Sequence, residues 1–547
     1  MPEWNAVALG RRLPRINIDR AALARIAGTL AFVTVTLFLL HLGNELVARD
    51  FWSPHGVRLA IPLAAGLVSA GIFHNVRYAE FSSLLRACTR ASAIGLIAFL
   101  VIEAPDFSLA NPEFADALTY VQIGYWVALA CAVASLFRPA FIIPVAIYIL
   151  STRLLVGHIS GLPISIIDIR YMLDMALYLA IFGIFAVRIA PMLGPWFASP
   201  DRQSEIVGVA MGLHLANYFW SGIAKLAIGP TPWYWIFENQ TSNQIPYTLE
   251  SGILPIGHIP WLTQLSYDVM SFLNTPLNAA IVVVQLFAII CVLRVGWLKI
   301  ASLLFDALHI GIYIFGGLFF WPWIWNNVTV WWAARSTGKA GLSNKTKLAC
   351  IATMLLGFPA LNMNPAAWLA WYDVADARQI YFEAVKQDGT TIKVPSAFFI
   401  THSYSVSHGY MGYFPVDGQY EATPLASTET LVRNEKSGDC VDPRTLPPEH
   451  KVETADERNN RQATLGRFLA SHHAKMLDRE ASVGRGSWYV HAHHHPSNPF
   501  LYDQFNNLNL RDVVGYNLVL ESDCLSLKNG KVQKKVVQRD TEYYDVG

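Results

Sequence analysis

The sequence predicts a polytopic α-helical membrane bundle followed by a mixed, β-containing soluble domain at the C-terminus. Hydrophobic residues make up 53% of the 547 residues and charged residues only 15%, whereas a soluble domain usually carries about 25% charged residues. The deficit is uneven, because residues 1 to about 365 are apolar runs with short breaks and residues 366–547 have ordinary soluble composition. Two parts are therefore expected. A formal net charge of +1 gives no global attraction to nucleic acid, so no such partner is expected.

The basic N-terminus, residues 1–25, contains five arginines and precedes an apolar run. A signal peptide has a similar charge pattern, but this run extends over about 20 residues and no small-residue cleavage site follows it. We therefore expect a cytoplasmic N-terminus and a retained first span.

About eleven spans, each of about 20 mostly apolar residues, are predicted between residues 26 and 366. The stretch 319–334 is separated from the preceding helix by Pro322 and counts as one of them, forming a proline-broken hairpin. The Trp-rich stretch 231–262 is too broken to span and is expected to be interfacial or re-entrant. The other ten segments begin near residues 26, 57, 87, 119, 138, 171, 206, 276, 298 and 346.

Charge in the loops predicts the orientation, since short cytoplasmic loops are rich in Lys and Arg. The loop near 77–90 has three arginines and is expected in the cytoplasm. The loop 104–118 has acidic residues and no Lys or Arg, so it is expected outside. Eleven spans then place the domain 367–547 outside the cytoplasm, and omission of the Pro322 hairpin would reverse it.

The soluble domain has few clear local signals. Strand-like segments are expected at Ile380–Ala384, 392–395 and 516–520, with a hairpin turn at Asp388–Gly389. A polar stretch near 453–480 favours a helix. These features predict a mixed, β-containing domain.

Two sets of side chains in this domain are candidate sites. Cys440 and Cys524 are its only cysteines, and an oxidising compartment would permit a disulfide between them. His491, His493 and His495 lie in a histidine-rich run. Alternate residues of a strand face one side, so the three imidazoles could converge on one metal ion. The alternative is a solvated loop.

The seventh span carries the most informative pattern, namely His214, Asn217, Tyr218, Ser221 and Lys225. At about 100° per residue these five positions occupy one arc of roughly 100° on an otherwise apolar helix. Such a stripe indicates a polar interior. The alternatives are hydrogen bonding between helices without chemistry and, for the lysine, snorkelling to the membrane interface.

Other spans carry ionisable groups that are expected to line or tune the same cavity. Asp306 and His309 share a face of the ninth span. Asp174 lies near the outer end of the sixth span, and His158 lies just after the fifth span. Ionisable groups inside spans are costly and usually face the bundle interior. Desolvation favours the neutral form of a buried lysine, and a neutral lysine is a competent general base, which singles out Lys225.

Residues 217–225 read NYFWSGIAK and are followed by Leu226. This resembles the Tyr-Phe-x-x-Gly-x-x-Lys-Leu motif of the HTTM superfamily, the multi-span proteins related to vitamin K-dependent gamma-carboxylase. Residues 305–324 look like the second recurring block of that family, a helix with a central histidine, here His309, followed by a Phe-rich break.

The resemblance covers about residues 20–365, and it implies that Lys225 is the base that deprotonates reduced vitamin K. It also implies a partner histidine upstream, for which His158 is the candidate, and a soluble part on the far side of the membrane. Two departures concern the carboxylase reaction itself. No counterpart of the carboxylase disulfide is evident, and the soluble domain 367–547 matches no carboxylase region.

Three functions remain open. The first is a membrane enzyme that uses the lysine base on a quinol, such as reduced vitamin K, or on another lipid-phase substrate. The second is a transporter, and the third is a non-catalytic anchor that presents the soluble domain. The expected partners are membrane lipid and a lipid-phase or peptide substrate, and a metal cofactor would fit the histidine run. No P-loop or GxSxG elbow supports nucleotide-driven transport or serine hydrolysis.

Overall fold

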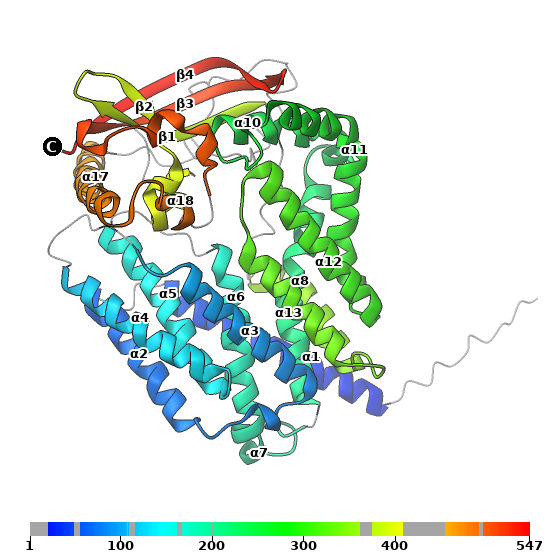
Figure 1. The fold of residues 1–547 in the computed structure, drawn as a ribbon. Coiled ribbons are helices and arrows are strands. Elements are labelled where there is room, and N and C mark those ends of the chain that lie inside the picture. Colours follow the sequence, from blue (N-terminus) through cyan, green and yellow to red (C-terminus); the bar gives the residue numbers. More distant parts are fainter. Residues whose placement is uncertain are drawn as a thin grey trace, which may run out of the picture.

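The computed structural model describes residues 20–48, 55–106, 108, 115–160, 167–199, 201–361, 373, 375–407, 454–491 and 496–547. The protein is mostly helical, and a small antiparallel sheet domain lies at one end of the helical part (Figure 1). The fold therefore has the two parts that the composition predicts.

The helical part contains a helix at each predicted span. Its helices are α1 (Arg20–Ala48), α2 (His55–Ile72), α3 (Ser83–Ile102), α4 (Ala115–Ser135), α5 (Ile142–Ser160), α6 (Ile167–Ile184), α7 (Ala190–Leu193), α8 (Arg202–Ala227), α9 (Tyr234–Glu238), α10 (Gln244–Glu250), α11 (Pro260–Cys291), α12 (Val295–Gly311), α13 (Trp321–Ser336) and α14 (Asn344–Leu361). The Trp-rich stretch 231–262 contains the short helices α9 and α10 and no spanning helix of its own, as predicted.

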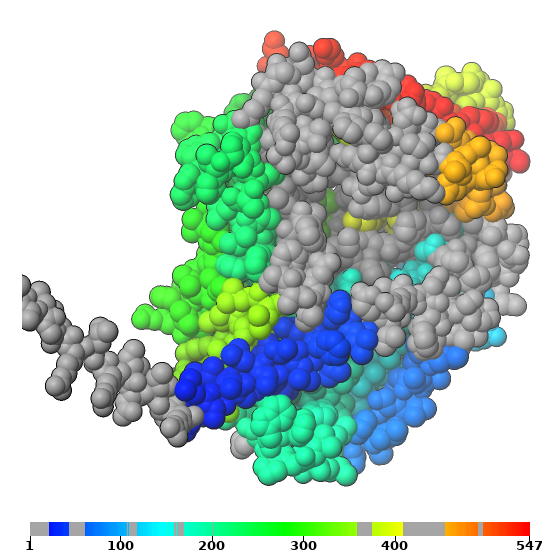
Figure 2. All heavy atoms as spheres, turned by 180° about the vertical axis from the view of Figure 1, so that it is seen from behind, coloured from blue at the N-terminus to red at the C-terminus, as the bar shows by residue number. Residues whose placement is uncertain are grey.

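Eight helices in the described part of the chain are long and apolar enough to cross a membrane, so the predicted count of eleven is not confirmed. The apolar part of α2 is shorter, and α13 has only 16 residues. Large apolar side chains cover the outside of the helices, for example Val35 and Phe38 on α1, which lies along the outer surface in Figure 2 (blue). These exposed apolar faces are compatible with an integral membrane protein.

The helix α11 begins well before the segment predicted near residue 276. Pro276 lies inside this 32-residue helix, and a helix of that length measures about 48 Å at 1.5 Å per residue. The hydrocarbon core of a membrane is about 30 Å thick. The apolar run after Pro276 is therefore only the second half of a longer helix.

The loops gather at two opposite ends of the helical part. Arg188 Nη2 lies 2.9 Å from Glu80 Oε2, and Lys345 Nζ lies 2.8 Å from Asp201 Oδ2, so the loops after α2, α6 and α13 meet at one end. The loop after α3 lies at the other end, where Asp106 pairs with Arg479 of the C-terminal domain (Figure 1). The loops near 77–90 and 104–118 thus lie at opposite ends, as their charges predict.

The C-terminal sheet has four antiparallel strands in the order β2-β1-β3-β4. They are β1 (Asp376–Lys386), β2 (Thr391–Lys393), β3 (Val513–Lys528) and β4 (Lys531–Asp545). The predicted hairpin turn joins β1 to β2, with Gly389 at a φ of +80°. The strand β4 is not anticipated from the sequence, because its alternation is obscured by charged residues on an exposed edge.

One face of the sheet packs on α17 (Ala455–Val483), the helix predicted near 453–480. Phe468 and Leu469 of α17 join Phe382 of β1 and Leu518 of β3 in a single buried cluster. The helix starts at a capping box in which Thr454 and Glu457 satisfy each other's backbone N–H groups. Apolar burial on this face holds the domain together.

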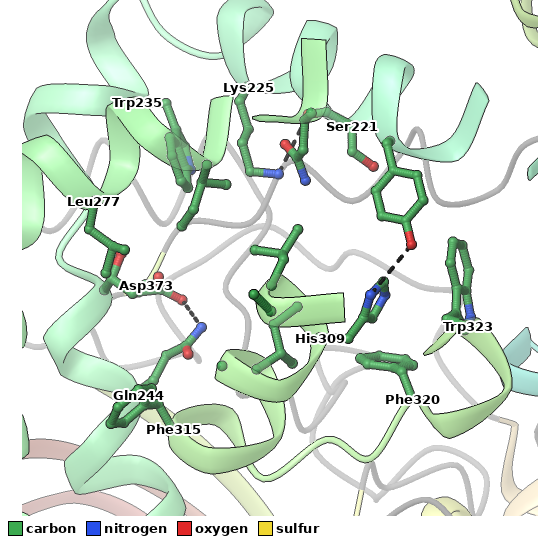
Figure 3. A pocket seen from close by; sticks show the side chains of 18 of the residues that line it. Ser221, Lys225, Trp235, Gln244, Leu277, His309, Phe315, Phe320, Trp323 and Asp373 are labelled. Carbon is green, nitrogen blue, oxygen red and sulfur yellow. Dashed lines mark hydrogen bonds between the residues drawn. The ribbon is translucent and has the colours of Figure 1, made fainter. Parts of the chain in front are cut away.

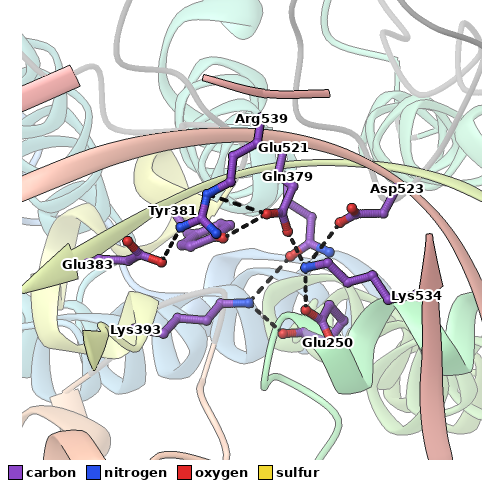
Figure 4. Close-up of polar contacts among 9 residues, drawn as sticks. All are labelled: Glu250, Gln379, Tyr381, Glu383, Lys393, Glu521, Asp523, Lys534 and Arg539. Atoms are coloured by element: carbon purple, nitrogen blue, oxygen red, sulfur yellow. Dashed lines mark hydrogen bonds and ion pairs between the residues drawn. The ribbon is translucent and has the colours of Figure 1, made fainter. Parts of the chain in front are cut away.

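The other face of the sheet carries charged side chains that reach the helical part (Figure 4). Lys534 of β4 lies 2.8 Å from Glu250 Oε1 of α10 and 3.4 Å from Asp523 Oδ2 of β3, and it also pairs with Glu521. Lys393 Nζ donates to the backbone carbonyl of Glu250 at 2.6 Å. The helix α10 is thereby tied directly to the sheet.

Candidate functional site

The polar stripe predicted on the seventh span lies on α8 and is buried. Asn217, Tyr218 and Lys225 are exposed by 1%, 3% and 4%, respectively. The helix packs closely on α14, where a Cβ at Gly212 would stand 2.6 Å from the backbone oxygen of Cys350. The stripe faces away from that contact, into the space between α8, α11 and α12.

A cavity of about 250 Å³ lies in that space (Figure 3). Four of the predicted residues on α8 line it, and so does His309 on α12. The other walls come from the α9–α10 region, α11, α12 with the turn that follows it, Trp323 of α13, and Asp373. The lining residues are Asn217, Tyr218, Ser221, Lys225, Trp235, Thr241, Gln244, Met270, Leu277, Ile281, Gln285, Ala307, Leu308, His309, Gly311, Ile312, Phe315, Phe320, Trp323 and Asp373.

Among the described residues that line this cavity, Lys225 is the only lysine or arginine. Its Nζ lies 3.5 Å from the backbone oxygen of Ser221 and 5.2 Å from the centre of the Trp235 ring. It also interacts electrostatically with the carboxylate of Asp373. The amine is therefore held in an apolar, aromatic wall with few direct hydrogen bonds.

A cluster of hydrogen bonds borders the cavity around Tyr218. The tyrosine ring stacks on Phe305 with a centroid distance of 3.8 Å, and its hydroxyl lies 3.4 Å from His309 Nδ1. His309 Nδ1 also lies 2.9 Å from the backbone oxygen of Phe305, which requires a proton on Nδ1. The ring nitrogen Nε2 is then the available acceptor of His309.

Two residues predicted to line the cavity lie behind it, in contact with α13. His214 Nε2 donates to Asn327 Oδ1 at 2.7 Å, and Asn327 Nδ2 donates to Asp306 Oδ1 at 2.9 Å. Neither His214 nor Asp306 is part of the lining. The prediction that they line the cavity is wrong, because their polar groups are hydrogen-bonded to Asn327 of α13.

Asp174 does not line the cavity either. Its carboxylate lies 3.7 Å from Arg170 one turn earlier on α6, so a local ion pair accounts for it. His158 belongs to α5, but its side chain lies outside the described residues.

The candidate sites of the soluble domain are only partly described. His493, His495 and the side chain of His491 lie outside the described residues, and no group of metal ligands is present among the residues described. Cys524 is disulfide-bonded. Its predicted partner, Cys440, lies outside the described residues, so the pairing stays a prediction.

Several residues of the cavity are not anticipated from the sequence. Asp373 comes from the chain between α14 and β1, and Gln244 and Thr241 come from the Trp-rich stretch. Asn239 begins a glycosylation tripeptide but is 0% exposed and contacts Asp373, so its amide has a structural role. The only sequence signal for Asn239, Thr241 and Gln244 is an unusual density of amides and hydroxyls between aromatic residues, and Asp373 has no such signal.

Two buried acceptors at the cavity wall have no hydrogen-bond partner among the described residues. They are Asn217 Oδ1 on α8 and Gln285 Oε1 on α11. Both side chains line the cavity, and their residues are exposed by 1% and 7%. Buried amide oxygens normally accept a hydrogen bond. The cavity therefore suits a ligand that carries hydroxyl or N–H donors.

Comparison with known proteins adds no assignment, since no protein-family model, curated protein or solved structure matches the chain.

Proposed function

We propose that this protein is a membrane enzyme of the HTTM type, in which Lys225 acts as the base on a hydroxyl-bearing substrate from the lipid phase. The observation that carries the proposal is a single lysine among the described lining residues of a largely apolar cavity, on the stripe that resembles the family motif. The substrate class that the resemblance implies is a quinol such as reduced vitamin K.

The lining of the cavity fits an aromatic headgroup with hydroxyl groups. Trp235, Phe315, Phe320 and Trp323 supply flat apolar surfaces, and aromatic pairs favour stacked or edge-to-face contacts. The free oxygens of Asn217 and Gln285 can accept hydrogen bonds from ligand hydroxyls. The volume of about 250 Å³ is slightly below that of typical ligand pockets, which start at about 300 Å³, so it suits a headgroup and not a whole lipid.

The chemical role of the lysine follows from its surroundings. A bound quinol would supply an acidic O–H group, and Lys225 Nζ would accept its proton. The resulting ammonium group would be stabilised by the Ser221 carbonyl, by the face of Trp235 and by the negative charge of Asp373. Water is largely excluded there, so these interactions are stronger than in solution.

The cavity has an apolar approach. Ala307 lines the cavity and is also exposed on the outside of α12, next to the exposed side chains of Leu303, Leu304 and Ile310. These neighbours lie on a helix that is apolar enough to span a membrane. A substrate dissolved in the hydrocarbon phase would therefore enter beside Ala307 without crossing water.

We also propose eleven passes, with the N-terminus in the cytoplasm and the sheet domain outside. The alternating ends of successive helices support the number, since the loops after α2, α6 and α13 meet at the end opposite to the domain. The excess of Lys and Arg in short loops supports the direction. The short α13 would cross as the second arm of the Pro322 hairpin.

Oxygen-dependent quinol turnover by the purified protein in lipid nanodiscs tests the proposal. We expect oxidised quinone or epoxide with the wild type and none with Lys225→Ala. Lys299→Ala removes a lysine outside the cavity lining and should retain turnover. Equal turnover by the wild type and Lys225→Ala would overturn the lysine mechanism, and no turnover by the wild type would refute the quinol as substrate.

A further inference from the structure

The carboxylate of Asp373 is unusual in its position and in its partners. The residue lies between α14 and the first strand of the sheet domain, yet it is 3% exposed and lines the cavity with Lys225 (Figure 3). Gln244 Nε2 donates to one carboxylate oxygen at 2.8 Å, and Asn239 Nδ2 donates to the other at 3.0 Å. Both oxygens are thus fixed by amide groups.

A second layer of amides and hydroxyls holds those donors in place. The backbone N–H of Asp373 donates to Asn239 Oδ1 at 2.6 Å. Asn278 Nδ2 of α11 donates to the backbone oxygen of Asn239 at 2.8 Å, and Thr241 Oγ1 donates to Asn278 Oδ1 at 2.6 Å. The carboxylate is therefore positioned by side chains from the α9–α10 region and from α11.

Neutral amides position this carboxylate but do not cancel its charge. Burial raises the pKa of Asp373, while hydrogen bonds from Asn239 and Gln244 and the charge of Lys225 oppose that rise. A buried charge is costly unless an opposite charge accompanies it. Within the described part of the lining, Lys225 and His309 are the only basic side chains.

We infer that Asp373 is a positioning residue that acts as the counter-ion of Lys225 and sets how much of its amine is charged. The inference concerns the site of the proposed function, but the charge interaction itself requires no particular substrate. The cavity is then assembled from the helical part and from the chain that leads into the sheet domain. Displacement of the Asp373 carboxylate from the cavity would alter the charge state of the lysine.

The experiment measures how fast Lys225 reacts with a membrane-permeant isothiocyanate, which adds to neutral amines and forms a thiourea. Labelling of the full-length protein in nanodiscs is quantified by peptide mass spectrometry, without any quinol. At pH 7.5 we expect Asp373→Asn to label up to about fourfold faster than the wild type, because the ammonium form has lost its counter-ion. Asp174→Asn, which neutralises a carboxylate outside the cavity, should label at the wild-type rate.

The pH dependence separates a charge effect from a simple opening of the cavity. Tyr218 and His309 are the other titratable groups in the lining, and both remain in the variant. At about pH 10 most of the amine is neutral in both proteins, so the labelling rate of Asp373→Asn should exceed that of the wild type by less. An excess that persists there, or an unchanged rate at pH 7.5, would overturn the inference.

A milder variant keeps the inference testable if Asp373→Asn does not fold. Gln244→Met removes one donor to the carboxylate and should give a smaller increase in labelling at pH 7.5. An unchanged rate in this folded variant would count against the inference. Labelling and quinol turnover are independent, so absence of turnover would refute only the substrate, and an unchanged labelling rate would refute only the counter-ion.

Discussion

Asp106, in the loop after α3, forms an ion pair with Arg479 on α17, so the helical part and the sheet domain are joined at this loop. Lys475 pairs with the same carboxylate, and Thr401 Oγ1 donates to the Asp106 backbone oxygen at 2.6 Å. Ser108 Oγ lies 3.0 Å from His472 Nδ1. A second connection between the two parts runs through Glu250 and Lys534.

Asp106→Asn should therefore weaken the docking of the domain. Burial opposes ionisation of Asp106, but the charges of Lys475 and Arg479 outweigh it and lower its pKa. The stabilisation is present above the ordinary pKa and is lost as the pH falls through the lowered pKa. We expect an unfolding temperature a few degrees lower at pH 7, measured by scanning fluorimetry in nanodiscs.

Asp201→Asn is the matched control, because that carboxylate pairs with Lys345 at the opposite end and is half exposed. It should change the unfolding temperature by less. Equal effects of the two variants would contradict a special role of the Asp106 loop in docking.

The raised pKa of Asp523 predicts that stability falls between about pH 4 and pH 7. Burial and then the neighbouring Glu521 raise its pKa to about 7. A carboxyl with a raised pKa contributes fully to stability below the ordinary pKa of aspartate, near about 4, and this contribution is lost as the pH rises to about 7. Asp523→Asn removes that loss, so its unfolding temperature should exceed that of the wild type at pH 7.5 and approach it near pH 4.

The exposed Asp503 on the domain surface provides the control variant, Asp503→Asn, which should follow the wild-type curve at every pH. Parallel curves for the wild type and Asp523→Asn between pH 4 and 7 would contradict the raised pKa of Asp523.

The contacts of Asn327 predict that its replacement destabilises the protein more than replacement of the adjacent Asn326. Asn327 contacts His214, Asp306 and the Tyr218 hydroxyl, so Asn327→Leu leaves two buried polar groups and the half-buried Asp306 carboxylate without this partner. An unsatisfied buried group costs about 1–3 kcal/mol. Asn326 is equally buried, but its Nδ2 has no partner among the described residues, so Asn326→Leu should destabilise less. Thermal unfolding of the two variants compares them directly, and the reverse order would contradict the assigned contacts.

The exposed position of Ala307 at the cavity wall predicts that a substrate enters the cavity beside this residue. Ala307→Trp places a large ring where the cavity meets the outside of α12, so we expect slower labelling of Lys225 by a bulky membrane-permeant isothiocyanate. Leu304→Trp adds the same ring to an exposed position outside the cavity lining and should not slow it. Equal labelling rates in both variants would place the entrance elsewhere.

The anchor hypothesis makes a contrary prediction for the helical part. If the helices only hold the sheet domain at the membrane, exchange of residues 26–361 for an unrelated anchor would leave function and domain stability intact. We expect instead a destabilised domain, because α10 and the α3 loop supply its contacts at Glu250 and Asp106. Limited proteolysis of the chimera and the wild type distinguishes the two outcomes.

The sequence by itself determined the features that depend on short-range periodicity. Apolar runs located the helices, since a spanning helix must be apolar along its length. The spacing of Asn217, Tyr218, Ser221 and Lys225 placed them on one face, because a helix repeats every 3.6 residues. The turn at Gly389 followed from local backbone preference.

Only the tertiary structure decided which polar groups meet. His214 and Asp306 share the expected helix faces with cavity residues. Their polar groups are nevertheless hydrogen-bonded to Asn327 of another helix, behind the cavity lining. Asp373 has no local pattern at all, and it shares the cavity with Lys225 only because its carboxylate packs against the α9–α10 region. Contacts between residues far apart in the chain depend on how helices pack, and local periodicity carries no information about that packing.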